Sequence, residues 1–184
     1  MSTRDELLKI TLREVAKRGI DGVSLSDIAR RVNIKPSSIY AFFESKDALI
    51  KESILMGGES KTAPPINIDF NKELKDILLD LYSHYIDEYS DGVKRDYFVV
   101  LSKESFTNKE IYKMYENLLY SIESQINLIL SLKLSNVDKE SEKILALSNV
   151  LSYAFVRIML SAINEGKESA IWDAEDLITS LLCS

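Results

Sequence analysis

The segment SLSDIARRVNIKPSSIYAFF, residues 24–43, constrains the fold of this 184-residue chain more than any other part. The small Ala29 stands four residues before Asn33 and ten before Ile39. A small residue lets two helices cross closely, and asparagine tolerates the left-handed backbone that a tight turn between them requires. Ile39 would anchor the second helix by one side and leave the other side free. The spacing is typical of a helix-turn-helix motif.

Capping signals predict where the helices around this motif begin. Ser24 stands three residues before Asp27, as in a capping box, so a helix should start at Leu25. Pro36 suits the first turn of the next helix because its missing N–H would be unpaired there. We expect helices at about 4–18, 25–32 and 36–43, and a fourth that starts after Ser45 and fades at Gly57-Gly58.

The segment ESKTAPPINIDF, residues 59–70, has two prolines and no helical period, so it predicts a connection between two domains. We expect a small module at residues 1–56 and a larger domain at residues 57–184. The small module carries ten Lys/Arg and eight Asp/Glu, whereas the larger domain carries thirteen and twenty-one. A mildly basic N-terminal module therefore precedes an acidic larger domain.

The larger domain has a helical pattern throughout. Six glycines and three prolines are too few for a loop-rich all-β chain, and no segment alternates as a strand would. Thr107 and Glu110 have the spacing of a capping box at the start of a long helix. The expected helices lie at about 74–89, closed by Gly92, at 97–103, from 107 onward, at 139–164, and from about Asp173 to the end.

The apolar window Leu145–Ile163 has nearly the length of a membrane span. Asn149 and Arg157 lie inside it, and both cost too much in lipid, so we interpret it as a buried helix. The last two helices carry more apolar surface than one neighbour can cover. This indicates a homodimer in which they complete a four-helix bundle, and packing within one chain is the alternative.

Few residues in this chain are suited to catalysis. His84 is the only histidine and Cys183 the only cysteine, and there is no Gly-rich phosphate loop or Ser-His-Asp set. We therefore expect no enzyme activity, no cofactor and no metal site. His84 with Asp80, Asp87 or Glu88 is more typical of a solvated helix face than of a metal site. The charged, amphipathic N-terminus has no export leader, so we expect a cytoplasmic protein and no membrane association.

Three pieces of the first module, GVSLSDIARRVNI, SSIYAFF and ESKDALI, resemble the TetR family of one-component transcriptional regulators. The resemblance covers residues 4 to about 52 and includes a first helix at the expected distance from the chain start. It implies an all-α fold, in which an N-terminal three-helix helix-turn-helix module is joined to a larger helical ligand-binding and dimerisation domain. Residues 1–56 would then bind DNA, and residues 57–184 would bind an effector and dimerise.

The resemblance also implies which residues contact DNA. Ser24 matches a hydroxyl that caps the second helix and faces a phosphate, and a hydroxyl beside free amides suits that role. Ser37 and Ser38 lie in the first turn of the recognition helix, where short hydroxyls can reach a base edge or a phosphate. Tyr40 and Lys46 match residues that meet backbone phosphate. A cap alone for Ser24, and plain solvent exposure for the two serines, are the alternatives.

The chain departs from the family pattern at three positions. Lys35 replaces the usual serine before the recognition helix, and it becomes a candidate phosphate contact together with Arg4. Phe42 replaces a histidine or tyrosine that can hydrogen-bond to phosphate, so one contact should be lost. Asn33 replaces the usual turn glycine, which its side chain permits. We expect the core of the module to contain Ile34, Ile39 and Phe43.

By the same resemblance, an effector cavity should lie among the helices from about Leu74 to Ile163. Aromatic rings with a few hydroxyls suit a flat or apolar ligand, although core or surface packing is their ordinary role. The acidic balance of the region favours a neutral or cationic effector. The candidate effector-binding residues are Tyr82, Tyr85, Tyr89 and Tyr115.

These features predict a homodimeric transcriptional repressor that binds a pseudo-palindromic double-stranded DNA operator. A small-molecule effector would release it, and the last two helices would form the dimer. An activator, or a regulator without a small-molecule effector, is an alternative. A helical protein-interaction adaptor is another, because a net charge of only +2 over residues 1–56 leaves it open.

Overall fold

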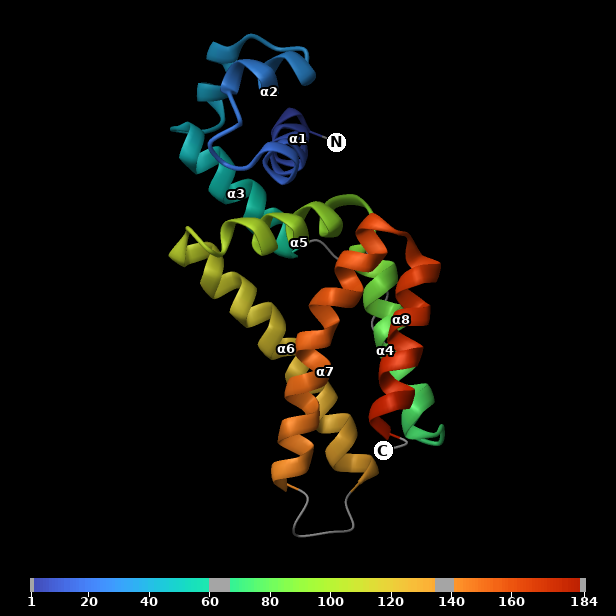
Figure 1. Cartoon of the computed structure of the whole chain (residues 1–184). Helices are drawn as coiled ribbons and strands as arrows, with labels where there is room; N and C mark the ends of the chain where they lie inside the picture. The colour runs from blue at the N-terminus through green and yellow to red at the C-terminus, as the bar shows by residue number, and fades with distance from the viewer. Residues whose placement is uncertain (1, 60–66, 135–140, 183–184) are drawn as a thin grey trace. The chain divides into compact units, whose positions relative to one another are not determined.

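The computed structural model describes residues 2–59, 67–134 and 141–182. Over these ranges the protein is all-helical, with eight α-helices, one 3₁₀ helix and no strand, as predicted (Figure 1). The chain divides into two compact units, Met1–Thr62 with Asp91–Met114 and Ala63–Ser90 with Tyr115–Ser184. The domain boundary after residue 56 stays a prediction, and these units differ from it by grouping 91–114 with the first one.

Helix α1 (Thr3–Arg18) is defined at both ends by its own sequence. The Ser2 hydroxyl accepts from the Asp5 N–H at 3.2 Å, and the Asp5 carboxylate accepts from the Ser2 N–H at 3.2 Å, which completes a capping box. Gly19 ends the helix with a φ of +76°, a conformation open to glycine. The buried face of α1 carries Leu7, Leu8, Leu12 and Val15.

In the first unit, α1 packs on α2 (Leu25–Arg31), α3 (Lys46–Glu59) and α5 (Gly92–Glu104). Gly57 of α3 permits the close approach, because a Cβ at this position would lie 2.8 Å from Cδ2 of Leu12. The prediction that this helix fades at Gly57-Gly58 is close, since α3 is described as far as Glu59. The pair lies inside α3, where it makes room for side chains of α1 and α5.

The second unit contains α4 (Leu74–Tyr89), most of α6 (Lys109–Lys133), α7 (Ser141–Asn164) and α8 (Lys167–Leu182). Helices α4 and α7 both pack on α8 and on each other (Figure 1). The core of this unit includes Leu78, Leu81, Tyr82, Phe155, Met159 and Ile178.

Two helices begin at caps other than those predicted. The Asn108 side chain, and not Thr107, accepts from the N–H groups of Glu110 and Ile111 at 3.0 and 3.2 Å, so it caps α6. Helix α5 begins at Gly92 and not at Tyr97, because the preceding aspartate accepts from its N–H at 2.6 Å. Gly92 therefore opens α5 and does not close α4.

Helix α8 begins earlier than the acidic residues near Asp173 suggested. Gly166 has a φ of +105°, and its carbonyl accepts from the Ala170 N–H at 3.3 Å, so the helix starts directly after this glycine. The predicted start missed the first turn because Lys167 and its neighbours carry no standard capping signal.

Helix α7 is long and apolar enough to cross a membrane, by length and composition alone. In the protein, 44% of its most apolar window is buried. Leu151, Phe155, Ile158 and Met159 form its buried face, in line with the interpretation as a packed helix.

Candidate nucleic-acid interface

The turn of the helix-turn-helix motif forms as its sequence predicts. Asn33 has a φ of +58°, and in the described ranges it is the only non-glycine residue with positive φ. The Ile34 N–H donates to the Ala29 carbonyl at 3.0 Å, which closes the turn onto α2. The Ser24 hydroxyl accepts from the Asp27 N–H at 3.1 Å, so the predicted cap of α2 is confirmed.

The recognition segment η1 (Pro36–Ala41) is a 3₁₀ helix and not the predicted α-helix. Its first bond runs from the Ser38 N–H to the Lys35 carbonyl at 2.9 Å. Side chains three residues apart eclipse in a 3₁₀ helix, so Ser37 and Tyr40 share one side of η1. Both are exposed, with 59% of Tyr40 accessible. This side of η1 therefore presents a serine and a tyrosine to solvent.

Ile39 and Phe43 hold the opposite side of η1 in the core. Both are almost fully buried, which confirms their predicted role. Ile34 is only half-buried, so its assignment to the core was wrong; it follows the turn, where the backbone runs along the surface. Phe42 is exposed and offers no hydrogen bond. Ser38 is half-buried, which leaves Ser37 the more accessible of the two serines.

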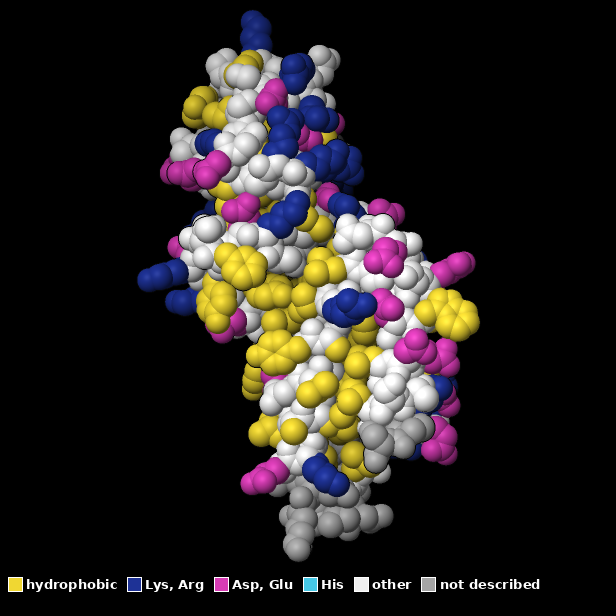
Figure 2. Space-filling model, in the orientation of Figure 1, with side chains coloured by type: hydrophobic (Ala, Val, Ile, Leu, Met, Phe, Trp, Pro, Cys, Tyr) yellow, Lys and Arg dark blue, Asp and Glu magenta, His cyan; other side chains and the backbone are white. Residues whose placement is uncertain are grey.

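The cationic candidates differ in their solvent exposure and in whether they already form an ion pair. Lys35 is exposed, and Lys46 is half-buried at the first position of α3, where Ser45 accepts an amide hydrogen bond at 3.0 Å. Arg4 forms an ion pair with Glu52, so a phosphate would have to compete with that carboxylate. Figure 2 shows Lys and Arg side chains gathered over the region of α1 and α2.

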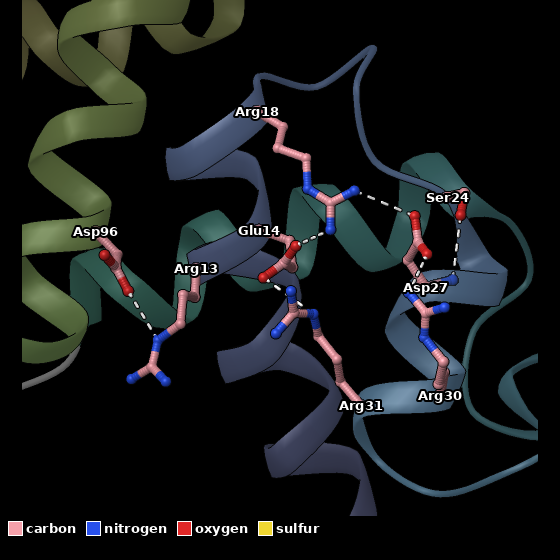
Figure 3. A network of polar contacts seen from close by, with 8 residues as sticks. All are labelled: Arg13, Glu14, Arg18, Ser24, Asp27, Arg30, Arg31 and Asp96. Carbon is pink, nitrogen blue, oxygen red and sulfur yellow. Dashed lines mark hydrogen bonds and ion pairs between the residues drawn. The ribbon is translucent and has the colours of Figure 1, made fainter.

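A buried carboxylate ties α2 to α1. Only 1% of the Glu14 side chain is exposed, and it forms ion pairs with Arg18 of α1 and, at 3.1 Å, with Nε of Arg31 of α2 (Figure 3). Arg18 also donates to the Asp27 carboxylate at 3.2 Å. A buried charge that loses a partner is costly, so these pairs fix how α2 sits on α1.

The Asp27 carboxyl lies at the positive end of α2. Its hydrogen bond with the Ser24 side chain, and then its contacts with Arg18, hold the pKa of Asp27 below 3.8. Arg30 adds an ion pair at 2.7 Å. The carboxylate is therefore charged at neutral pH and complements the helix dipole.

Helix α5 fixes the junction between α1 and α2 from outside the motif. The Glu104 carboxylate accepts from the Ile20 N–H at 3.2 Å, and Nζ of Lys103 donates to the Ala16 carbonyl at 2.9 Å. Sequence reasoning missed both contacts and the Glu14–Arg31 pair. The only available signal was the four-residue spacing of Glu14 and Arg18 on α1.

The predicted effector tyrosines of α4 lie in a packed aromatic cluster. The buried Tyr82 hydroxyl donates to the Leu151 carbonyl at 2.5 Å, and burial raises its pKa far above the usual range. The Tyr85 hydroxyl accepts from Nε2 of Gln125 at 2.6 Å. Both rings pack on Phe155, with centroids 6.4 and 5.2 Å away.

The other two tyrosines have different settings. Tyr89 is buried, and its ring lies 6.1 Å from the ring of Tyr85. Tyr115 is half-buried on α6, where burial raises the pKa of its phenol. The structure thus joins three of the four candidates in one cluster along α4.

His84 packs edge-on against the Tyr85 ring, and its Nε2 lies 3.8 Å from the Glu88 carboxylate. Within residues 2–59, 67–134 and 141–182, no three His, Cys, Asp or Glu side chains are grouped as a metal site would require.

Comparison with known proteins places this geometry in context. Residues 7–53 match the family described as bacterial regulatory proteins, tetR family. The biofilm operon icaADBC HTH-type negative transcriptional regulator IcaR of Staphylococcus aureus (strain Newman) is 26% identical over 133 residues, which cover 61% of this chain and 69% of IcaR.

Two solved structures share the fold over nearly the whole chain. A TetR-like transcriptional regulator from Rhodococcus sp. RHA1 has a TM-score of 0.72 at 13% identity, covering 99% of this chain and 96% of that one. AibR in complex with isovaleryl coenzyme A and operator DNA has a TM-score of 0.62 at 13% identity, covering 97% of each chain.

A helix-turn-helix with a free outer side, carried by an all-helical body, defines a DNA-binding transcriptional regulator. The first module, residues 7–53, matches the tetR family of bacterial regulatory proteins, as the motif resemblance predicted.

Proposed function

We propose that this regulator is a homodimeric repressor, which binds a pseudo-palindromic operator in the cytoplasm and is released by a small-molecule effector. Residues 1–56 would form the DNA-binding domain, and residues 57–184 would bind the effector and dimerise. The relative IcaR is described as a negative regulator, and AibR was solved with both a ligand and operator DNA. Both descriptions support the proposal by analogy.

The observation that carries the proposal is the exposed side of η1. Ser37 and Tyr40 lie together on it, while Ile39 anchors the other side in the core. Ser37 and Ser38 would read base edges, and Tyr40 would donate to a backbone phosphate. Three further residues would contact phosphate from the elements on either side of η1, namely Ser24, Lys35 and Lys46.

The exposed face of α7 supports the dimer. Val150, Tyr153 and Leu160 recur along one stripe of the helix, and 72% of Tyr153 is exposed. Trp172 on α8 is also exposed, with 68% of its surface accessible. Figure 2 shows hydrophobic side chains gathered along α7 on the face in view. A two-fold partner would cover this surface and place two recognition segments in successive major grooves about 34 Å apart.

The effector region would be the α4 cluster with Tyr115. Because the hydroxyls of Tyr82 and Tyr85 already have partners, a ligand that enters must rearrange the rings or replace those hydrogen bonds. Such a rearrangement is a physical route from effector binding to a change in the dimer.

Fluorescence anisotropy tests DNA binding. The labelled duplex carries the pseudo-palindrome upstream of the coding sequence, and affinity is measured at several salt concentrations. Each phosphate contact steepens the loss of affinity with salt, so Lys46→Ala should lower the slope of log affinity against log salt by about 1. Tyr40→Phe should weaken binding to all sequences, and Ser38→Ala should change sequence preference.

Matched controls lie in α6. Lys113→Ala and Tyr120→Phe make the same chemical changes at exposed positions and should leave affinity unchanged. Equal affinity for a scrambled duplex, or a flat salt dependence, would exclude the regulator mechanism and favour the adaptor. A monomeric mass in sedimentation would contradict the dimer.

A further inference from the structure

An apolar groove lies within the first unit, and its lining includes none of the proposed DNA-contacting residues and none of the candidate effector tyrosines. Its volume is about 340 Å³, within the range of small-molecule sites. One face of α3, the start of α6 and the turn after α1 line it. Ile50, Ile54 and Ile111 are buried in its floor, while Leu55 and Met114 stand at its sides with Ile20.

The polar rim of the groove carries an excess of negative charge. Lys51 and Glu110 face each other across it and form an ion pair at 3.0 Å. The Asn108 side chain is occupied by the amides of α6. Asp47 is exposed, and among the described residues no cation pairs with it. The rim therefore holds one carboxylate that can accept a partner.

We propose that this groove binds a small organic cation, with the apolar part of the ligand on the isoleucine floor and its cationic group beside Asp47. The apolar lining gives affinity through burial, and the carboxylate selects the sign of the charge. The volume limits the ligand to the small end of the usual range, so a simple six-carbon amine is a suitable probe.

Helix α3 links the groove to the proposed DNA surface. Asp47, Ile50, Lys51, Ile54 and Leu55 follow the spacing of one helix face along α3. The same helix begins at the proposed phosphate contact Lys46, so a ligand that shifts α3 also shifts that contact. Only this regulatory step rests on the proposed function.

Methyl NMR spectroscopy of the full chain tests binding without DNA. The protein is titrated with n-hexylammonium, n-hexanol and hexanoate, which share one chain and differ in charge. We expect about millimolar binding of n-hexylammonium, with shifts at the methyl groups of Ile50, Ile54 and Ile111 and none at Ile178 of the other unit. Hexanol should bind more weakly, and hexanoate most weakly.

Two variants assign the site. Asp47→Asn should reduce the preference for the cation over hexanol by about twofold to fivefold, the size of one exposed ion pair. Leu55→Trp should fill the groove and weaken all probes at least about tenfold. Leu128→Trp is its control, since Leu55 and Leu128 are 44% and 57% exposed and only the first lines the groove.

Several results would overturn the proposal. Absence of shifts at the groove methyls would exclude the site, and equal binding of hexanoate would exclude a cation as its ligand. If Leu55→Trp instead changed the oligomeric state, the groove would be an interface between copies of the chain. If the ligand-free protein did not bind the operator duplex, the proposed function would be refuted, but the NMR evidence for ligand binding in the groove would still stand.

Discussion

Arg30 and Arg31 are neighbours on α2 that are both exposed but pair with carboxylates of different burial. Nε of Arg31 lies 3.1 Å from the Glu14 carboxylate, whose side chain is 1% exposed. Nη2 of Arg30 lies 2.7 Å from Asp27, and the Arg30 side chain is 75% exposed. Arg31→Gln and Arg30→Gln each remove one positive charge, so they form a matched pair.

The expected cost follows from what each substitution leaves behind. Arg31→Gln leaves the buried Glu14 carboxylate with Arg18 as its remaining cation. The Arg31 contact is an ion pair to a buried oxygen that has no hydrogen-bond partner. The expected loss lies above the about 1 kcal/mol of an exposed pair and below the about 3–5 kcal/mol of a buried charge left without a partner, because Arg18 remains. Arg30→Gln removes an exposed pair and should cost about 0.2–1 kcal/mol.

Urea unfolding followed by far-UV circular dichroism measures the two losses, and amide hydrogen exchange locates them. We expect faster exchange in α1 and α2 for Arg31→Gln and near wild-type exchange for Arg30→Gln. Equal losses in the two variants, or a larger loss for Arg30→Gln, would refute the conclusion that the Glu14 pairs hold α2 on α1.

Three further predictions test other parts of the structure. Gly57→Ala should destabilise the protein by up to about 2 kcal/mol in urea unfolding, because overpacking against Leu12 costs more than the helix propensity gains; a stabilised variant would contradict this. Tyr82→Phe should lower the free energy of unfolding by about 0.5–1.5 kcal/mol, since the bond to a carbonyl of α7 is lost, and an unchanged midpoint would show that the bond contributes nothing. The Asp27 carboxyl should titrate below 3.8 in NMR spectra, so its contribution to stability is present above that pH and is lost as the pH falls through the folded pKa. Ser24→Ala should raise this pKa, and no change would exclude the hydroxyl as its main cause.

The helix-turn-helix could be predicted because its determinants are local. The Ser24 cap, the left-handed Asn33 and the proline at the start of η1 each act within a few residues of chain. The alternation of buried Ile39 and Phe43 with exposed Tyr40 also follows from short-range spacing. These features placed the motif, and the resemblance to the TetR family then indicated which of its residues contact DNA.

The glycine pair in α3 shows where helix ends cannot be predicted from neighbouring residues alone. Gly57 resembles a helix terminator in sequence, but it lies where α1 and α5 pack closely on α3, and a Cβ there would lie 2.8 Å from Cδ2 of Leu12. The start of α6 was also misplaced: Asn108 caps this helix in place of the adjacent Thr107, and asparagine is the more strongly preferred N-cap of the two.

The all-helical class, the motif and the outward side of the recognition segment could be predicted, since helix caps and apolar periodicity are properties of neighbouring residues. The packing of α5 with the first unit, the pairing of Glu14 with Arg31 and the packed, hydrogen-bonded tyrosines of α4 could not. These contacts join residues far apart in the chain. Their partners are chosen by packing and burial, which no local pattern encodes.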